Sequence, residues 1–104
     1  MPAYLIGRME ITDIDAYNEY KKRTPGLVSR FGGRFLCRGV KKTTVEGPKE
    51  TRRLVIVEFP TSKDAQDFYY SPEYQHARTL RENAASEMQI VIVEGFEESQ
   101  TQAP

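Results

Sequence analysis

The sequence has few of the residues on which common active sites are built. Its 104 residues include one cysteine, one histidine and no tryptophan. A single cysteine excludes an intramolecular disulfide and a multi-cysteine zinc site. The pair Gly32-Gly33 precedes a predicted strand instead of a helix, so it indicates a turn and not a phosphate-binding loop. We therefore expect neither a metal nor a cofactor.

Long apolar runs are also missing, as is a basic segment after Met1. No signal peptide or membrane span is predicted, so we expect a cytoplasmic protein without a membrane partner. Hydrophobic residues make up 38% of the chain, well above the level that is typical of disorder. We assign a single domain to residues 1–97 and interpret residues 98–104 as a polar C-terminal tail.

Charge of one sign is not in excess, because 15 basic and 15 acidic residues balance. This balance argues against a protein that binds nucleic acid by bulk charge. The charges are segregated, however: residues 21–53 hold eleven basic and two acidic residues, whereas residues 54–104 hold three basic and nine acidic ones. The basic block has three interpretations, namely protection of an edge strand, steering of a small anion to a pocket, and contact with the acidic half of another subunit.

Apolar runs and capping residues divide the chain into strands and helices. Strands are predicted at residues 3–9, 34–40, 53–59 and 88–96, and helices at residues 12–31, 61–70 and 71–85. Ser71 as N-cap, followed by Pro72 and Glu73, is a strong helix start. Pro25 lacks an N–H and restricts the residue before it, so we expect it to kink or split the first helix.

The order strand, helix, strand, strand, helix, strand predicts a ferredoxin-like α+β fold, βαββαβ, with a four-stranded antiparallel sheet. Helices cover one face of such a sheet. The first, third and fourth strands are apolar on both faces, and no residues remain to cover the second face. We therefore expect a homodimer through the open sheet face.

Several motifs occur together in an order that is typical of one family. They are AYLIG at residues 3–7, Asp13 with Tyr17 and Tyr20, GGRFL at residues 32–36, RRLVIVEFP at residues 52–60, and SPEYQ at residues 71–75 with Arg78 and Arg81. Over residues 3–96 the chain resembles the Domain of Unknown Function 1330 family. The resemblance implies a dimeric α+β barrel, in a superfamily that also holds cofactor-free monooxygenases of the antibiotic-biosynthesis type, muconolactone isomerases and stress-responsive proteins.

Arginine and tyrosine supply the candidate ligand-binding groups. In a helix that begins at Ser71, Tyr74, Arg78 and Arg81 lie on one stripe, and a guanidinium can hold a carboxylate through two parallel hydrogen bonds. The predicted substrate-binding residues are Arg38, Tyr69, Tyr74, Arg78 and Arg81. The alternative is structural: Arg78 and Arg81 pair with Glu73, Glu82 or Glu58.

Glu58 and His76 are the candidate catalytic residues. Glu58 lies inside an apolar strand, where burial would raise its pKa and suit a general base. It could equally form a salt bridge with Arg38 or Arg8. His76 is the only histidine and can move protons near neutral pH, but a helical histidine is more often exposed. We expect Cys37 to be a buried, inert thiol.

Two classes of function follow from these residues. The first is a pocket within each subunit that acts on a small, anionic and partly apolar molecule, by oxygenation or isomerisation without a cofactor. The second is a non-catalytic dimeric module that binds a ligand or serves in a stress response. A solvent-connected cavity that joins Glu58, Arg38 and Arg78 favours the first, and a fully ion-paired Glu58 in a dry core favours the second.

Overall fold

A computed structural model describes residues 1–39 and 41–96 of the chain. Four strands, β1 (Ala3–Ile11), β2 (Arg34–Gly39), β3 (Arg53–Phe59) and β4 (Ala85–Glu94), form an antiparallel sheet in the order β2-β3-β1-β4. The helices are α1 (Ile14–Arg30), α2 (Ser62–Tyr70) and α3 (Pro72–Arg78), and a 3₁₀ turn, η1 (Thr79–Arg81), follows α3. The predicted ferredoxin-like fold is confirmed. Val40 and the predicted tail at residues 98–104 lie outside the described residues.

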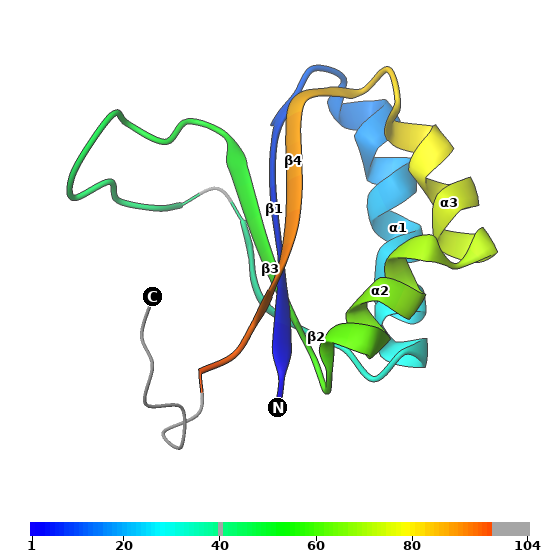
Figure 1. Ribbon diagram of the computed structural model, residues 1–104. Coiled ribbons are helices and arrows are strands. Elements are labelled where there is room, and N and C mark those ends of the chain that lie inside the picture. The colour runs from blue at the N-terminus through cyan, green and yellow to red at the C-terminus, as the bar shows by residue number, and fades with distance from the viewer. Residues whose placement is uncertain (40, 97–104) are drawn as a thin grey trace.

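All three helices cover one face of the sheet, which leaves the other face open (Figure 1). The connection between β2 and β3 projects from the open side and contains Glu46. This two-layer arrangement gives the sheet two faces with different surroundings, and the candidate site depends on which face each strand residue occupies.

Local capping explains where the helices begin. The Asp13 side chain accepts from the N–H of Ala16 at 3.1 Å, Thr61 from Asp64 at 3.0 Å, and Ser71 from Tyr74 at 3.2 Å. Each cap satisfies an N–H that has no partner inside its own helix. The predicted N-cap Ser71 is confirmed, and the caps Asp13 and Thr61 lie at or within one residue of the predicted helix starts at residues 12 and 61.

The first helix ends where the glycine pair predicted. Gly32 has a φ of +79°, and Gly33 donates from its N–H to the Val28 carbonyl at 2.9 Å. A side chain at Gly33 would come within 2.7 Å of the Phe59 ring. The pair therefore both turns the chain and allows the end of α1 to approach β3.

Two helix features differ from the prediction. Of the kink or split expected at Pro25, the split does not occur, because α1 continues through it from Ile14 to Arg30. The helix predicted at residues 71–85 ends at Arg78. Thr79 then donates from its hydroxyl to the His76 carbonyl at 2.6 Å. The Ala84 carbonyl accepts from the N–H groups of Thr12 and Asp13, just before α1. This contact between Ala84 and the start of α1 requires a turn, and β4 begins at Ala85 and not at the predicted Met88.

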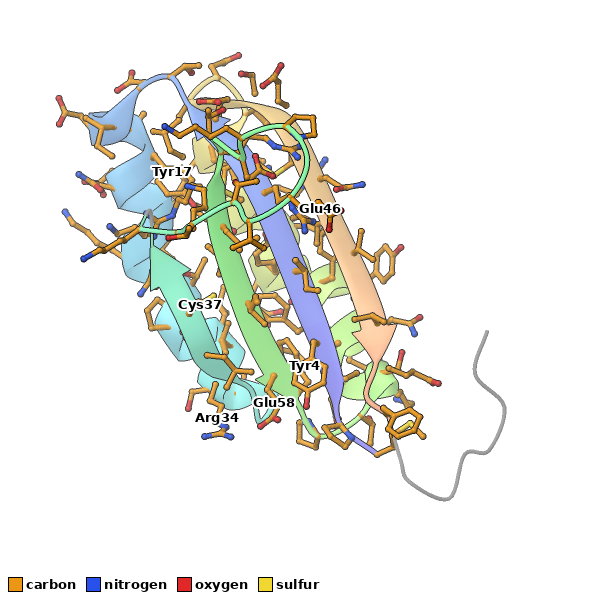
Figure 2. All side chains as sticks on the ribbon, turned by 90° about the vertical axis from the view of Figure 1, so that its left-hand side faces the viewer. Tyr4, Tyr17, Arg34, Cys37, Glu46 and Glu58 are labelled. Carbon is orange, nitrogen blue, oxygen red and sulfur yellow. The ribbon has the colours of Figure 1, made fainter. Side chains whose placement is uncertain are left out.

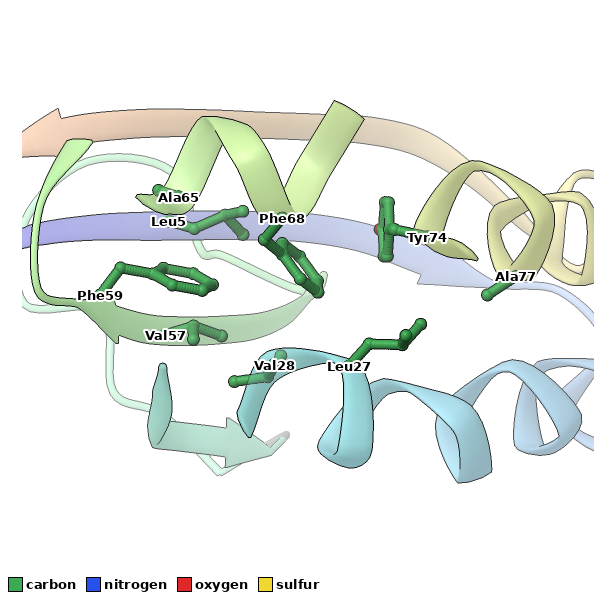
Figure 3. Close-up of a cluster of buried hydrophobic side chains, with 9 residues drawn as sticks. All are labelled: Leu5, Leu27, Val28, Val57, Phe59, Ala65, Phe68, Tyr74 and Ala77. Carbon is green, nitrogen blue, oxygen red and sulfur yellow. The ribbon is translucent and has the colours of Figure 1, made fainter. Parts of the chain in front are cut away.

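The main hydrophobic core fills the space between the helices and the sheet (Figure 3). Phe59 is fully buried, and the Phe68 ring lies 5.3 Å from it and 4.6 Å from Tyr74, centroid to centroid. The nine residues of the cluster are Leu5, Leu27, Val28, Val57, Phe59, Ala65, Phe68, Tyr74 and Ala77. Burial of this apolar surface holds the helices on the sheet.

The open face is apolar along its middle. Ile6 pairs in register with Ile56 and with Val91, and Cys37 lies beside Ile56 (Figure 2). Cys37 is exposed, so the prediction of a buried thiol is wrong. The reason is a register shift in β2 between Phe35 and Cys37, which turns the thiol away from the helices.

Candidate functional site

A cavity of about 50 Å³ lies between α1 and the helix-covered face of the sheet. Its apolar lining includes Leu5, Met9 and Ile90. Gly7 also lines it, and a side chain there would meet Met9 Cε at 3.4 Å and Ile90 Cγ1 at 3.9 Å, so the missing side chain keeps this space open. One water needs about 10–15 Å³, so the cavity takes roughly three to five non-hydrogen atoms.

The polar part of the lining comes mainly from α1. Four polar residues of α1 line the cavity at the spacing of one helix face: Tyr17, Tyr20, Lys21 and Thr24. Arg38 from β2 and Tyr74 from α3 complete the polar lining. Lys21 and Arg38 also line a wider outer groove beside Asp15 and Glu19. These two cationic residues therefore stand between the cavity and the outside, and among the described residues no carboxylate lines the cavity itself.

Arg38 is held at the cavity by a carbonyl that Pro25 leaves free. In a regular helix the Lys21 carbonyl would accept from the N–H four residues later, which proline lacks. Arg38 Nη2 instead donates to this carbonyl at 2.8 Å and to Thr24 Oγ1 at 3.2 Å. Its guanidinium also lies 4.5 Å from the centroid of the Phe35 ring. The proline in α1 thus creates an anchor for a cavity arginine.

Two tyrosine hydroxyls meet across the cavity lining. Tyr20 Oη and Tyr74 Oη are 2.7 Å apart, and Arg81 Nη2 donates to Tyr74 Oη at 3.4 Å. The Arg81 guanidinium also lies 5.3 Å from the centroid of the Tyr20 ring. Burial, together with the neighbouring Tyr74, holds the pKa of Tyr20 well above 10.0, so this phenol keeps its proton at neutral pH.

Positive charge accumulates behind the cavity. Arg53 lies 5.7 Å from the centroid of the Tyr17 ring, and Tyr17 donates from its hydroxyl to Met9 Sδ at 3.7 Å. Burial and the positive charge of Arg53 lower the pKa of Arg38, which remains protonated near neutral pH. Arg53 Nε and Arg81 Nε are buried with no hydrogen-bond partner among the described residues. Such groups favour an anion nearby.

The carboxylates that could neutralise these arginines lie elsewhere. In the described part of the chain, none comes within salt-bridge distance of Arg38, Arg53 or Arg81. The predicted ion pairs of Arg81 with Glu73, Glu82 or Glu58 are therefore wrong. Burial works to lower the pKa of Arg81, but the oxygens of Tyr74 and Tyr20 outweigh it and raise the pKa. Phenol oxygens take the place of a carboxylate here.

The structure brings together three of the five predicted binding residues. Arg38 and Tyr74 line the cavity, and Arg81 contacts Tyr74 behind it. Arg78 instead bonds through Nη1 to Gln75 Oε1 at 3.1 Å, and Tyr69 lines a separate surface pocket beside Ile92. Of the predicted stripe, Tyr74 and Arg81 therefore meet through η1, and Arg78 does not join them.

Glu58 and His76, the two predicted proton-transfer residues, both lie outside the cavity lining. Glu58 is on the open face, where Arg34 Nε donates to Glu58 Oε1 at 2.8 Å (Figure 2). That hydrogen bond lowers the pKa of Glu58, so the expected rise is wrong, and its predicted partners Arg38 and Arg8 are wrong as well. His76 is exposed on α3.

Sequence reasoning missed Tyr20, Lys21, Thr24 and Arg53. The signal was present: Tyr17, Tyr20, Lys21 and Thr24 recur at helical spacing on the face of α1 that packs inward. Polar side chains at core positions need partners or a polar cavity. Arg53 could not be recognised as a site residue because it is the first residue of β3, and in sequence the end of a strand resembles an exposed turn.

Two classes of site have no candidate in the described part of the chain. Residues 1–39 and 41–96 contain no group of three or more His, Cys, Asp or Glu residues that could hold a metal ion. Over the same residues, no helix has both the length and the apolar character needed to cross a bilayer.

One family model matches nearly the whole chain. Described as "Domain of unknown function (DUF1330)", it covers residues 2–96. Among curated proteins, no match is found.

Solved structures share the fold at low sequence identity. A protein of unknown function from Rhodopseudomonas palustris is 17% identical, with a TM-score of 0.75 over 92% of this chain and 83% of that one. A dimeric ferredoxin-like protein of unknown function from Jannaschia sp. CCS1 is 14% identical, with a TM-score of 0.73 over 91% and 100%. SnoaB, a cofactor-independent oxygenase from Streptomyces nogalater, is 11% identical, with a TM-score of 0.66 over 92% and 94%. At these identities the likeness establishes the fold alone.

Proposed function

We propose that this chain, which belongs to the DUF1330 family, is a cytoplasmic homodimer whose subunits each bind a small organic anion in the cavity beneath α1. A single observation carries the proposal. Arg38 lines a cavity that no described carboxylate lines, and its Nη1 and Nε groups have no acceptor among the described residues. A carboxylate oxygen would accept a charge-assisted hydrogen bond from one of these donors.

The size and surroundings of the cavity support a small ligand. A volume of about 50 Å³ suits an acid of two or three carbons better than an aromatic substrate. Leu5, Met9 and Ile90 would contact its apolar part. Lys21 stands beside Arg38 at the outer groove and would attract the anion from solvent.

The proposed dimer forms through the open sheet face. Val91 and Val93 are 41% and 45% exposed on this part of the molecule, and Val45, in the projecting loop, is 91% exposed. The row formed by Ile6, Ile56 and Val91 is an apolar surface that a second copy would remove from water. The similar protein from Jannaschia sp. CCS1 is described as dimeric, which supports the same assembly here.

A second candidate function is cofactor-independent oxygenation or isomerisation in the same cavity. The likeness to SnoaB, described as a cofactor-independent oxygenase, favours it. In such an enzyme, proton transfer would fall to the hydroxyls of Tyr20 and Tyr74, since both line the cavity and Glu58 and His76 do not. Oxygen consumption in the presence of a bound acid, or conversion of that acid to an isomer, would distinguish this candidate from a binding module.

The anion site is tested by titrating the protein with acetate, glycolate and propionate and measuring affinity by calorimetry. We expect Arg38→Ala to weaken binding by about 10- to 100-fold, because a hydrogen bond to a charged group contributes about 1.5–3 kcal/mol. Arg34→Ala is the matched control, since Arg34 begins the same strand but pairs with Glu58 on the open face. Failure of all three acids to bind the unmodified protein, or equal losses in the two variants, would overturn the proposal.

A further inference from the structure

The hydroxyls of Tyr20 and Tyr74 carry more donors than their own contact uses. Each phenol has one O–H, and their single contact at 2.7 Å consumes only one of the two hydrogens. Neither hydroxyl has another hydrogen-bond acceptor among the described residues. One O–H donor is therefore left over, at two side chains that both line the cavity.

Arg81 lies beside both hydroxyls and holds the Tyr20–Tyr74 pair in place. A guanidinium can only donate, and Arg81 Nη2 donates to Tyr74 Oη. Either hydroxyl can be the donor in the contact at 2.7 Å, so the spare hydrogen can lie on Tyr20 or on Tyr74. Tyr74 is 2% exposed and Arg81 is 7% exposed, so solvent does not compete with this chain of bonds. Tyr20 is the less buried of the two tyrosines, so its hydroxyl is the better placed of the two to meet a ligand.

We infer that Tyr20 is a specificity-determining donor to the ligand, in a hydrogen-bond relay in which Arg81 holds Tyr74 and Tyr74 donates to Tyr20 once the ligand accepts the Tyr20 hydrogen. The inference rests on the proposed function and extends it. Arg38 would hold the carboxylate, and Tyr20 would donate to a second oxygen on the same molecule. Tyr74 and Arg81 are positioning residues that orient the Tyr20 hydroxyl.

The ligand class follows from two donor sets in one small cavity. Arg38 and Tyr20 both line a space that takes roughly three to five non-hydrogen atoms, so the two acceptor groups must be close together in the ligand. A carboxylate with an oxygen on the neighbouring carbon meets this requirement. The cavity is therefore suited to short 2-hydroxy or 2-oxo acids in preference to simple alkyl carboxylates.

Glycolate and propionate provide a matched pair of probes, because they have the same number of non-hydrogen atoms and differ in a hydroxyl against a methyl group. We expect the unmodified protein to bind glycolate about three- to tenfold more tightly than propionate, the range that one neutral hydrogen bond provides. Tyr20→Phe should remove this preference by weakening glycolate alone. Tyr70→Phe, at an exposed position on α2, is the control and should keep it.

The outcomes separate this inference from the proposed function. If neither acid binds, the proposed function fails. If both bind but Tyr20→Phe keeps the full preference for glycolate, the proposed function stands and the relay is overturned. Should Tyr20→Phe fail to fold by circular dichroism, Tyr74→Phe carries the same test, because removal of the Tyr74 hydroxyl breaks the relay. A preference that Tyr74→Phe leaves unchanged would then overturn the inference.

Discussion

The arginines on the two faces of the sheet differ in whether a carboxylate pairs with them. On the open side, Arg34 approaches Glu58 at 2.8 Å. Arg8 and Arg52 share Glu50, at 3.4 and 2.9 Å. The Arg52 bonds help to lower the pKa of Glu50 to about 2, so this carboxylate stays ionised over the whole physiological range. Each of these arginines has a counter-charge that the chain itself supplies.

On the helix-covered side, the arginines around the cavity have no such partner. Among the described residues, Arg38, Arg53 and Arg81 contact a carbonyl, hydroxyls and aromatic rings, but no carboxylate. Burial makes an uncompensated charge more costly than it would be at the surface. The arginines of the open side therefore have carboxylates as partners, whereas those around the cavity leave room for an anion. Four experiments test this difference.

The largest effect is expected on the open face. Ile56→Asp introduces a charge in the middle of the apolar row, and an unpaired carboxylate in an interface costs several kcal/mol in each subunit. We expect the dimer to dissociate to monomers, as measured by sedimentation velocity over a range of concentrations. Ile14→Asp, at an exposed position on α1, should remain dimeric. A monomeric mass for the unmodified protein at all concentrations would contradict the proposed interface.

A smaller effect is expected from Pro25→Ala on the covered side. The new N–H can bond to the Lys21 carbonyl, so the unfolding free energy should rise by about 2 kcal/mol. The same bond competes with Arg38 for that carbonyl, so glycolate should bind several-fold more weakly. Pro72→Ala, at the first position of α3 where no N–H is needed, should change neither quantity much. Equal or tighter glycolate binding by Pro25→Ala would show that the anchor is unimportant.

Alkaline unfolding tests the buried phenol directly. The pKa of Tyr20 is raised in the folded protein, so above pH 10 the unfolded state loses its proton first and stability falls as pH rises through the folded pKa. The loss should reach about 1 kcal/mol within the first pH unit above 10. Urea unfolding at pH 8–11 would measure it, and Tyr20→Phe should flatten the curve. Tyr17→Phe acts in the same direction, because burial raises the pKa of Tyr17 too.

The smallest effect is expected from Glu58→Gln on the open face. The Arg34 hydrogen bond lowers the pKa of Glu58, so its stabilisation is present above the unfolded pKa of about 4.5 and is lost as pH falls through the folded value. We expect a slightly lower melting temperature at pH 7, no difference in strongly acidic solution, and unchanged binding of glycolate. Loss of glycolate binding in Glu58→Gln would show that this carboxylate does belong to the binding site.

The elements could be predicted because their causes are local. Asp13, Thr61 and Ser71 cap helices within a few residues of their own position, and the strand predicted at residues 53–59 has the observed bounds Arg53–Phe59. The end of α3 could not be predicted in this way. It depends on the contact of Ala84 with the start of α1, which lies about seventy residues away along the chain.

The candidate site was predicted only in part, and for a related reason. Alternation along β3 separates Glu58 from its neighbours Val57 and Phe59, but it does not say which set faces the helices. Tertiary packing buries Val57 and Phe59 against the helices. Glu58, which points the opposite way, therefore lies on the open face beside Arg34. Arg38 was found as a candidate, but its anchor on the Lys21 carbonyl joins two elements whose contact the sequence does not encode locally.

Local sequence is enough to predict the order of the elements, the helix starts, the turn at Gly32-Gly33 and the apolar character of both sheet faces, because each depends on neighbouring residues or on a short period. Which arginines have carboxylate partners is set by tertiary packing. That choice depends on which face of the sheet each side chain occupies and on which distant element packs there. On the covered face, packing placed tyrosines and a proline-freed carbonyl beside the arginines and left the carboxylates outside.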